Sequence, residues 1–249
     1  MRVTRCFVPA ALAADAALTL PEGASVHIAK VLRLRPGAQL RLFDGRGGEF
    51  EAQIQAIERG QVQVRVGAHC PLERESPVAV ALLQCLARAE RMDFIVQKAT
   101  ELGVASIVPV CSEHSLMRLD AASAQRRQQH WQAVTISACE QCGRNRVPPV
   151  SLPLEFQVAI AAATAPVRLM LHPAATRTLA EALHELSATS AEKALALLIG
   201  PEGGLSEREL EQAARLDFIG CTLGPRVLRA ETAPLAALSA VQTLLGDFA

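Results

Sequence analysis

The chain has 249 residues, half of them apolar, and its 25 basic and 25 acidic side chains give a formal net charge of zero. This length can bury one large core or two unequal ones. No stretch reaches about 18 uninterrupted apolar residues, and the first 20 residues lack a clean apolar segment, so we expect no membrane span and no signal peptide.

The cysteines favour a reducing compartment. There are seven, an odd number without framework spacing, so we expect no disulfides and a cytoplasmic location. Cys139 and Cys142 have the spacing of a zinc or redox pair, but no second pair of ligands follows at a suitable distance. We therefore predict no metal site.

The basic residues are unevenly distributed. The first 150 residues are mildly basic, and only Lys30, Lys98 and Lys193 are lysines among the 25 basic residues. Arginine suits bidentate contact with phosphate better than lysine does. This bias is compatible with an RNA partner, although genomic composition is an alternative explanation.

Residues 40–66 predict a small antiparallel unit, a barrel. Apolar and polar residues alternate there at period two, in three runs separated by Asp44-Gly45, Gly47-Gly48 and Gly60. The preceding residues predict a short helix and turn that carry Lys30, Arg33 and Arg35. These three side chains are either RNA contacts or an ordinary solvated surface.

From residue 77 onward, strands alternate with helices, which indicates an α/β domain with a parallel sheet. Apolar spacing predicts helices over 92–102 and 123–141. Residues 71–77 form a plausible linker between the two parts. The predicted strands are 78–85, 104–110, 167–171, 194–200 and 219–224.

Three strand ends in the last third of the chain are each followed by a loop that contains proline or glycine, in "LMLHPAA", "LLIGPEGG" and "TLGPRVLRAETA". After the second, Ser206 and Glu209 have the spacing of a capping box, which predicts a helix start. Ligands bind beyond the carboxyl ends of parallel strands, so the three loops predict one pocket. The signatures of a P-loop, a dinucleotide-binding Rossmann domain and a G-x-S-x-G hydrolase elbow are absent.

Two of these loops resemble a known class of enzymes. "IGPEGGLSERE" and "LGPRVLRAETA" are similar to the cofactor loops of the SPOUT RNA methyltransferases. Further segments, "ACEQCGRNRVP", "QKATELGV", "KVLRLRPG" and "HP", resemble the RsmE family, which methylates N3 of one uridine in small-subunit (16S) ribosomal RNA. The resemblance covers nearly the whole chain.

The resemblance implies an α/β fold with two domains. Residues 1–72 would form a PUA-like RNA-binding β-barrel, and residues 73–249 a SPOUT methyltransferase domain with a parallel sheet. The chain from about Leu195 would pass through an earlier loop to make a C-terminal trefoil knot, a feature that is rare in proteins. The family also implies a homodimer, S-adenosylmethionine as cofactor, and the structured small ribosomal subunit as substrate.

The cofactor would lie on the three loops. Gly200, Gly203 and Gly204 would let the main chain wrap around it, and backbone groups near Leu223, Gly224 and Leu228 would bind the adenine. The full set of implied cofactor residues is Leu171, His172, Pro173, Ile199, Gly200, Pro201, Gly203, Gly204, Leu223, Gly224, Pro225 and Leu228.

Methylation of uracil N3 requires the weakly acidic N–H to lose its proton. Arg229 is the first candidate for stabilising the resulting anion and for phosphate contact. Glu231 and Glu202 are candidate orienting or proton-accepting carboxylates. A carboxylate at the start of the last helix would also favour the helix dipole, so Glu231 has a structural alternative.

The polar helix end "CEQCGRNR" predicts contact with a splayed-out base and its phosphates, with a solvated helix cap as the alternative. The predicted RNA-binding residues are Lys30, Arg33, Arg35, Arg88, Glu140, Gln141, Arg144 and Arg146. Two other functions stay open: a related knotted enzyme that methylates ribose 2′-OH or another base, and a non-catalytic RNA-binding protein with a blocked pocket.

Overall fold

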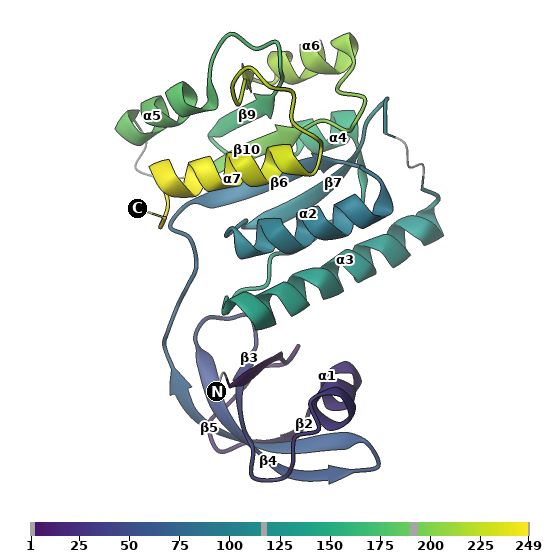
Figure 1. Cartoon of the computed structure of the whole chain (residues 1–249), viewed down its shortest axis with the longest axis vertical. Coiled ribbons are helices and arrows are strands. Elements are labelled where there is room, and N and C mark those ends of the chain that lie inside the picture. Colours follow the sequence, from purple (N-terminus) through teal and green to yellow (C-terminus); the bar gives the residue numbers. More distant parts are fainter. Residues whose placement is uncertain (1–2, 116–118, 190–193, 249) are drawn as a thin grey trace. The chain divides into compact units, whose positions relative to one another are not determined.

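The structure is a computed structural model that describes residues 3–115, 119–189 and 194–248 (Figure 1). The chain forms two compact units. The first comprises Met1–Glu75 together with Cys139–Val147, and the second comprises Ser76–Ala138 together with Pro148–Ala249. A segment from the middle of the sequence therefore returns to the N-terminal unit.

The first unit is built on a five-stranded sheet. Its strand order is β1 (Thr4–Phe7), β3 (Gln39–Phe43), β4 (Glu49–Glu58), β5 (Gln61–Cys70) and β2 (Ala17–Thr19). The β3–β4 and β4–β5 pairs are antiparallel as predicted. The β5–β2 pair is also antiparallel, whereas β1 pairs with β3 in parallel. Arg59 and Gly60 both have positive φ angles, the conformation that a two-residue hairpin turn requires between β4 and β5.

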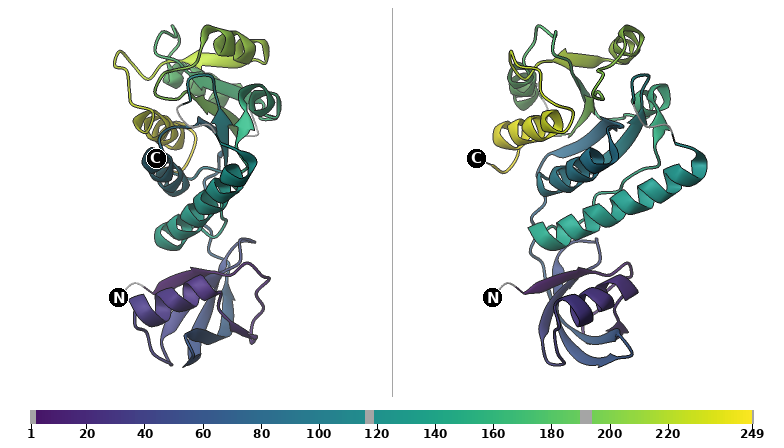
Figure 2. Two further views of the ribbon diagram at one scale, coloured as in Figure 1. Left: turned by 90° about the vertical axis from the view of Figure 1, so that its right-hand side faces the viewer. Right: turned by 45° about the vertical axis from the view of Figure 1, so that its right-hand side comes forward.

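The alternation in residues 40–66 places one side of each strand in the core. Leu40, Leu42, Ile54 and Val64 are at most 1% exposed, while the intervening polar residues face outward. Helix α1 (Glu22–Val26) and the π-helical turn η1 (His27–Val31) lie against β5 (Figure 2). The predicted short helix is therefore present.

The second unit contains a six-stranded parallel sheet, which confirms the prediction of an α/β domain. The order is β11 (Phe218–Cys221), β9 (Val167–Leu171), β10 (Ala194–Ile199), β6 (Ala79–Cys85), β7 (Ser106–Cys111) and β8 (Leu154–Glu155). β11 ends at Cys221, so the prediction of a strand through residue 224 is wrong. The φ of +102° at Gly224 is incompatible with an extended strand and makes a turn instead.

Helices cover both faces of this sheet. One face buries side chains of α2 (Ala89–Glu101), α3 (Ala121–Cys142), α5 (Leu179–Thr189) and α7 (Thr232–Leu244), and α2 and α7 are visible over it in Figure 1. The other face packs against α4 (Phe156–Ala161) and α6 (Glu207–Arg215). The predicted inward residues of α3 are confirmed, since Trp131 is fully buried, Ala138 is 2% exposed and Val134 packs against the core.

The predicted capping box is present at the start of α6. The Ser206 hydroxyl accepts a hydrogen bond from the Glu209 amide, and the Glu209 carboxylate accepts one from the Ser206 amide. This cap fixes the point at which the glycine loop becomes a helix.

The strand order is compatible with the predicted knot. β11 pairs with β9 on the side away from β10, so the chain crosses over the end of β9 before α7 packs against α5 and α2. Passage through a loop stays a prediction. Across the described ranges, no helix is both long enough and apolar enough to cross a membrane.

Candidate active site

The three predicted loops meet at one edge of the parallel sheet. They follow β9, β10 and β11, which are adjacent, and the last residues of these strands, Leu171, Ile199 and Cys221, are in register. The His172 amide donates to the Cys221 carbonyl at 2.9 Å, which holds the first loop against the third. The prediction that the three loops converge is therefore confirmed.

A cavity of about 620 Å³ opens between these loops. Its volume lies within the roughly 300–1,000 Å³ that is usual for small-molecule sites. Ten of the twelve predicted cofactor residues line it: Leu171, His172, Pro173, Ile199, Gly200, Pro201, Gly203, Gly204, Leu223 and Leu228. Gly224 and Pro225 do not line it, although they belong to the same loop.

Backbone geometry explains two of the glycines. Gly204 has a φ of +73°, a left-handed conformation that side chains disfavour. At Gly203 an added Cβ would lie 3.0 Å from the Cβ of His114, so the loop packs closely against the segment after β7. Turn geometry and packing therefore favour glycine at these two positions, in addition to the cofactor wrapping that the resemblance implies.

The two predicted carboxylates converge on an arginine that the sequence analysis did not select. Arg91 on α2 donates from Nη1 to Oε1 of Glu202 at 2.9 Å, and its Nε lies 3.6 Å from Oε2 of Glu231. Glu202 and Arg91 line the cavity. Glu231 does not line it, but it contacts Arg91, which does. No sequence signal distinguished Arg91, because its partners are more than 100 residues away along the chain.

The cavity also contains exposed cationic groups. Arg229 and Arg226 both line it, and both are exposed. Within the described part of the chain, the Arg229 side chain makes no hydrogen bond or ion pair. Its guanidinium is therefore free to meet an anionic group at the cavity.

The residues of the cavity fit the S-adenosylmethionine that the sequence resemblance implies. Glu202 lines the cavity, and its buried Oε2 atom has no hydrogen-bond partner among the described residues, so it can accept a hydrogen bond from a group bound there. The described residues include no cluster of three or more histidine, cysteine or acidic side chains that could hold a metal ion.

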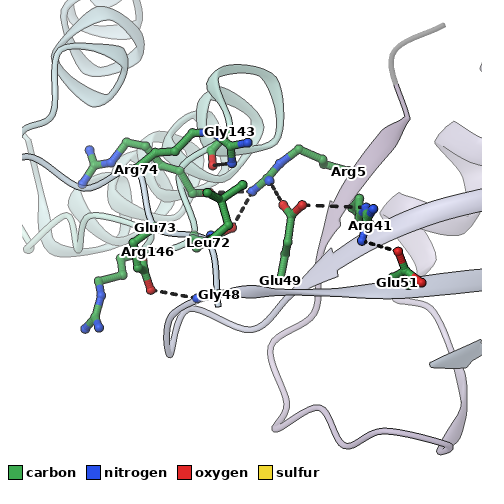
Figure 3. A network of polar contacts seen from close by, with 12 residues as sticks. Arg5, Arg41, Gly48, Glu49, Glu51, Leu72, Glu73, Arg74, Gly143 and Arg146 are labelled. Atoms are coloured by element: carbon green, nitrogen blue, oxygen red, sulfur yellow. Dashed lines mark hydrogen bonds and ion pairs between the residues drawn. The ribbon is translucent and has the colours of Figure 1, made fainter. Parts of the chain in front are cut away.

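The first unit contains a separate polar network (Figure 3). Arg5 forms an ion pair with Glu49, and its Nη2 donates to the Arg144 carbonyl and to Oδ1 of Asn145, both at 2.8 Å. Burial lowers the pKa of Arg5, and the neighbouring Glu49 carboxylate opposes this shift. The network joins the first strand to the segment 139–147.

Glu75 binds the same segment from the other side. It accepts hydrogen bonds from Nε and Nη2 of Arg144, at 2.9 and 2.6 Å, and from the backbone amides of Asn145 and Arg146. Arg144 is only 6% exposed and Asn145 is fully buried. These contacts give the segment a structural role inside the first unit, and the burial of Arg144 and Asn145 differs from the solvated helix cap that was the alternative.

Glu140 also has an internal partner. Its Oε1 accepts a hydrogen bond from the Phe7 amide at 3.0 Å, and burial raises the pKa of its carboxyl group. Arg144 and Glu140 are therefore committed to contacts within the unit. The other predicted RNA-binding residues are exposed: Lys30, Arg33, Arg35, Arg88, Gln141 and Arg146.

Two family models match the chain. Residues 74–242 match a model described as an RNA methyltransferase domain, and residues 20–67 match an RNA methyltransferase PUA domain. The first match covers most of the second unit together with residues 139–147 of the first unit, and the second match lies within the first unit.

Similar proteins cover the full chain. A curated relative from Buchnera aphidicola subsp. Schizaphis graminum, named ribosomal RNA small subunit methyltransferase E, is 32% identical over 99% of this chain and 98% of its own. A Legionella pneumophila methyltransferase solved with bound SAM is 36% identical, with a TM-score of 0.93 over 100% of both chains. A Neisseria gonorrhoeae ribosomal RNA small subunit methyltransferase E, also bound to S-adenosyl methionine, is 36% identical, with a TM-score of 0.89 over 100% of both chains.

Proposed function

The chain belongs to the ribosomal RNA small subunit methyltransferase E (RsmE) family, and we propose that it methylates N3 of one uridine in 16S ribosomal RNA. It is an S-adenosylmethionine-dependent ribosomal RNA methyltransferase, and two similar proteins, one of them named ribosomal RNA small subunit methyltransferase E, were solved with this cofactor. The choice of N3, and of the structured small subunit as substrate, is the proposal.

One observation carries the proposal: the cavity at the carboxyl ends of β9, β10 and β11 is lined by an exposed arginine and a carboxylate, Arg229 and Glu202. An N–H group that must lose a proton needs an acceptor and a cation beside it. The open cavity also argues against a non-catalytic protein with a blocked pocket.

The residues divide the chemistry between them. When bound, S-adenosylmethionine supplies a methyl group on a sulfonium sulfur. Arg229 stabilises the negative charge that develops on the uracil as N3 is deprotonated, and it can contact the adjacent phosphate. Glu202 and Glu231 orient the base or accept its proton, and the loop backbone aligns the reacting atoms.

The exposed basic side chains of the first unit, together with the Gln141 amide, are proposed to position the RNA. Lys30, Arg33 and Arg35 lie exposed on and after η1, and Gln141 and Arg146 are exposed near the end of α3. The chain is neutral overall, so binding is expected to depend on RNA shape as well as charge.

We also propose that the protein acts as a homodimer in the cytoplasm, where small ribosomal subunits are its substrate. The dimer is what the sequence resemblance to the family implies. Sedimentation of the purified chain tests the oligomeric state.

The test of the reaction uses tritiated S-adenosylmethionine and small ribosomal subunits that lack the modification, followed by nucleoside analysis. We expect label in 3-methyluridine. Arg229→Ala should reduce the rate by about 10²–10³-fold, as loss of one charge-stabilising group does, while binding of S-adenosylhomocysteine is retained.

Arg215→Ala on the exposed face of α6 is the matched control and should keep the wild-type rate. Label in a ribose-methylated nucleoside or in another base would refute the N3 assignment. Cofactor binding without any methyl transfer to the small subunit would refute its assignment as the substrate.

A further inference from the structure

Arg91 occupies an unusual position between two carboxylates. It lies in the first turn of α2, next to the cavity, and its guanidinium contacts Glu202 through Nη1 and approaches Glu231 through Nε. The backbone amide of Arg88 donates a second hydrogen bond to the same oxygen of Glu202, Oε1, at 3.3 Å. Residues at the start of α2 therefore hold Glu202 through only one of its two carboxylate oxygens.

The other oxygen of Glu202 is left without a partner. Its Oε2 atom is buried and accepts no hydrogen bond from the described residues, and the same is true of Oε2 of Glu231. A buried acceptor without a partner destabilises the fold, so such atoms usually have a partner in the working state. One guanidinium shared by two carboxylates also leaves this group of three side chains with a surplus negative charge. The group is therefore suited to receive a donor.

We propose that Arg91 is a positioning residue that holds Oε1 of Glu202, so that Oε2 is free to accept the proton from uracil N3. The inference rests on the proposed function and deepens it. The N3–H proton passes to Oε2 of Glu202 and later to water. The N3 lone pair forms the new bond to the methyl carbon, while the S–C bond breaks and its electron pair remains on sulfur.

The structure favours Glu202 over Glu231 as the acceptor. Glu202 lines the cavity, whereas Glu231 does not. Glu231 is the residue immediately before α7, where the helix dipole stabilises its negative charge whether or not it reacts. Its role here is to share the guanidinium and so limit how strongly Arg91 holds Glu202.

If Glu202 accepts the proton, each variant should shift the pH dependence of the methyl-transfer rate in a defined direction. A base must be ionised, so the rate should fall as the pH decreases through the pKa of the acceptor. Loss of the positive charge of Arg91 should raise that pKa, and loss of the negative charge of Glu231 should lower it. Among the described residues, the other charged or titratable groups around the cavity, unchanged in both variants, are Arg88, His114, His172, Cys221, Arg226 and Arg229.

The experiment measures single-turnover methyl transfer as a function of pH for wild type, Arg91→Gln, Arg91→Lys and Glu231→Gln, together with the affinity for S-adenosylhomocysteine by calorimetry. Arg91→Gln should reduce the maximal rate by about 10²-fold and move the acid limb of the profile up by about one pH unit. Its cofactor affinity should stay within about threefold of wild type. Arg91→Lys keeps the charge and should restore the position of the limb.

Glu231→Gln should move the acid limb in the opposite direction. If Arg91→Gln does not fold, this variant alone tests whether the neighbouring charges control the ionisation of Glu202. Arg215→Gln, from the exposed Arg215–Glu211 pair, is the matched control and should leave both rate and limb unchanged. A lower rate with an unmoved limb in both test variants, or a loss of cofactor affinity that accounts for the lower rate, would overturn the inference.

Failure of the proposed function gives a different result. In that case the wild-type enzyme makes a methylated nucleoside other than 3-methyluridine. The pH profiles followed on that product would still decide whether Arg91 controls the ionisation of Glu202.

Discussion

The polar network of the first unit and the cavity of the second unit differ in how far their buried carboxylates are hydrogen-bonded within the fold. In the network, Glu75 accepts hydrogen bonds from Arg144 and from two backbone amides, and Arg5 is paired with Glu49. At the cavity, Glu202 and Glu231 share Arg91 and each keeps a buried oxygen without a hydrogen bond. Arg5 Nε is the exception in the network, since it too lacks a partner among the described residues.

This difference separates structural charges from functional ones. A buried charge whose partners lie within the fold stabilises it, and its removal leaves the partner charge uncompensated. A buried acceptor that keeps free capacity beside a cavity is available to a ligand. Both regions contain arginine and glutamate side chains, and only the three-dimensional contacts distinguish their roles.

Breaking the network should have the largest effect. Arg144→Ala leaves the Glu75 carboxylate without its main partner, and we expect a loss of about 3 kcal/mol in the free energy of unfolding of the first unit. Urea denaturation measures this loss. Arg46→Ala, at an exposed position of the same unit, should change stability by less than about 0.5 kcal/mol. Equal stabilities for both variants would contradict a structural role for Arg144.

The loop after β11, which lines the cavity, should be sensitive to substitutions that restrict its backbone conformation. Gly224 has a φ of +102°, so Gly224→Ala should cost about 1–2 kcal/mol through strain and weaken the binding of S-adenosylhomocysteine. Thermal unfolding and calorimetry measure the two effects. Gly220→Ala is the control, because its φ is not positive and an added Cβ would make only an ordinary 3.7 Å contact with Ala175. A tolerated alanine at position 224 would mean that the loop can relax.

The cap of α6 gives a smaller effect. Ser206→Ala removes the acceptor for the Glu209 amide, and we expect a loss of about 1 kcal/mol in stability. Ser137→Ala, at an exposed position within α3, should be close to neutral. If the two alanine variants unfold at the same temperature, the capping box contributes nothing measurable.

The smallest effect concerns Glu140, whose pKa is raised by burial. Its folded-state pKa lies above its unfolded value, so the folded state binds the proton more tightly and stability is lost as pH rises through this window. Glu140→Gln keeps an acceptor for the Phe7 amide and should flatten this slope, with a stability change below about 1 kcal/mol. Urea denaturation at several pH values between about 4 and 7 measures the slope. An unchanged slope in the variant would show that Glu140 does not titrate differently on folding.

The cavity could largely be predicted because its signals are local. A strand that ends in glycine and proline, such as 197–204, carries the information for a loop within a few residues. Parallel pairing then brings three such ends to one edge of the sheet. The sequence does not reveal that β11 ends at Cys221, because Thr222 and Leu223 are residue types that suit a strand. The turn that follows depends on the left-handed conformation of Gly224.

The roles of the arginines could not be predicted in this way. Arg91 is 111 residues from Glu202, and Arg144 is 69 residues from Glu75. An arginine at a polar helix end has the same sequence pattern whether it meets RNA or a distant glutamate. Likewise, nothing in the sequence indicated that the segment 139–147 returns to the first unit.

The most direct test of this account measures both stability and methyl transfer for Glu202→Gln and Arg144→Ala. We predict that Glu202→Gln loses about 10²-fold in the rate of methyl transfer and unfolds at the wild-type urea concentration. Arg144→Ala should lose stability and keep its rate per folded molecule. The reverse pattern, with an active Glu202→Gln and a stable but inactive Arg144→Ala, would contradict the account.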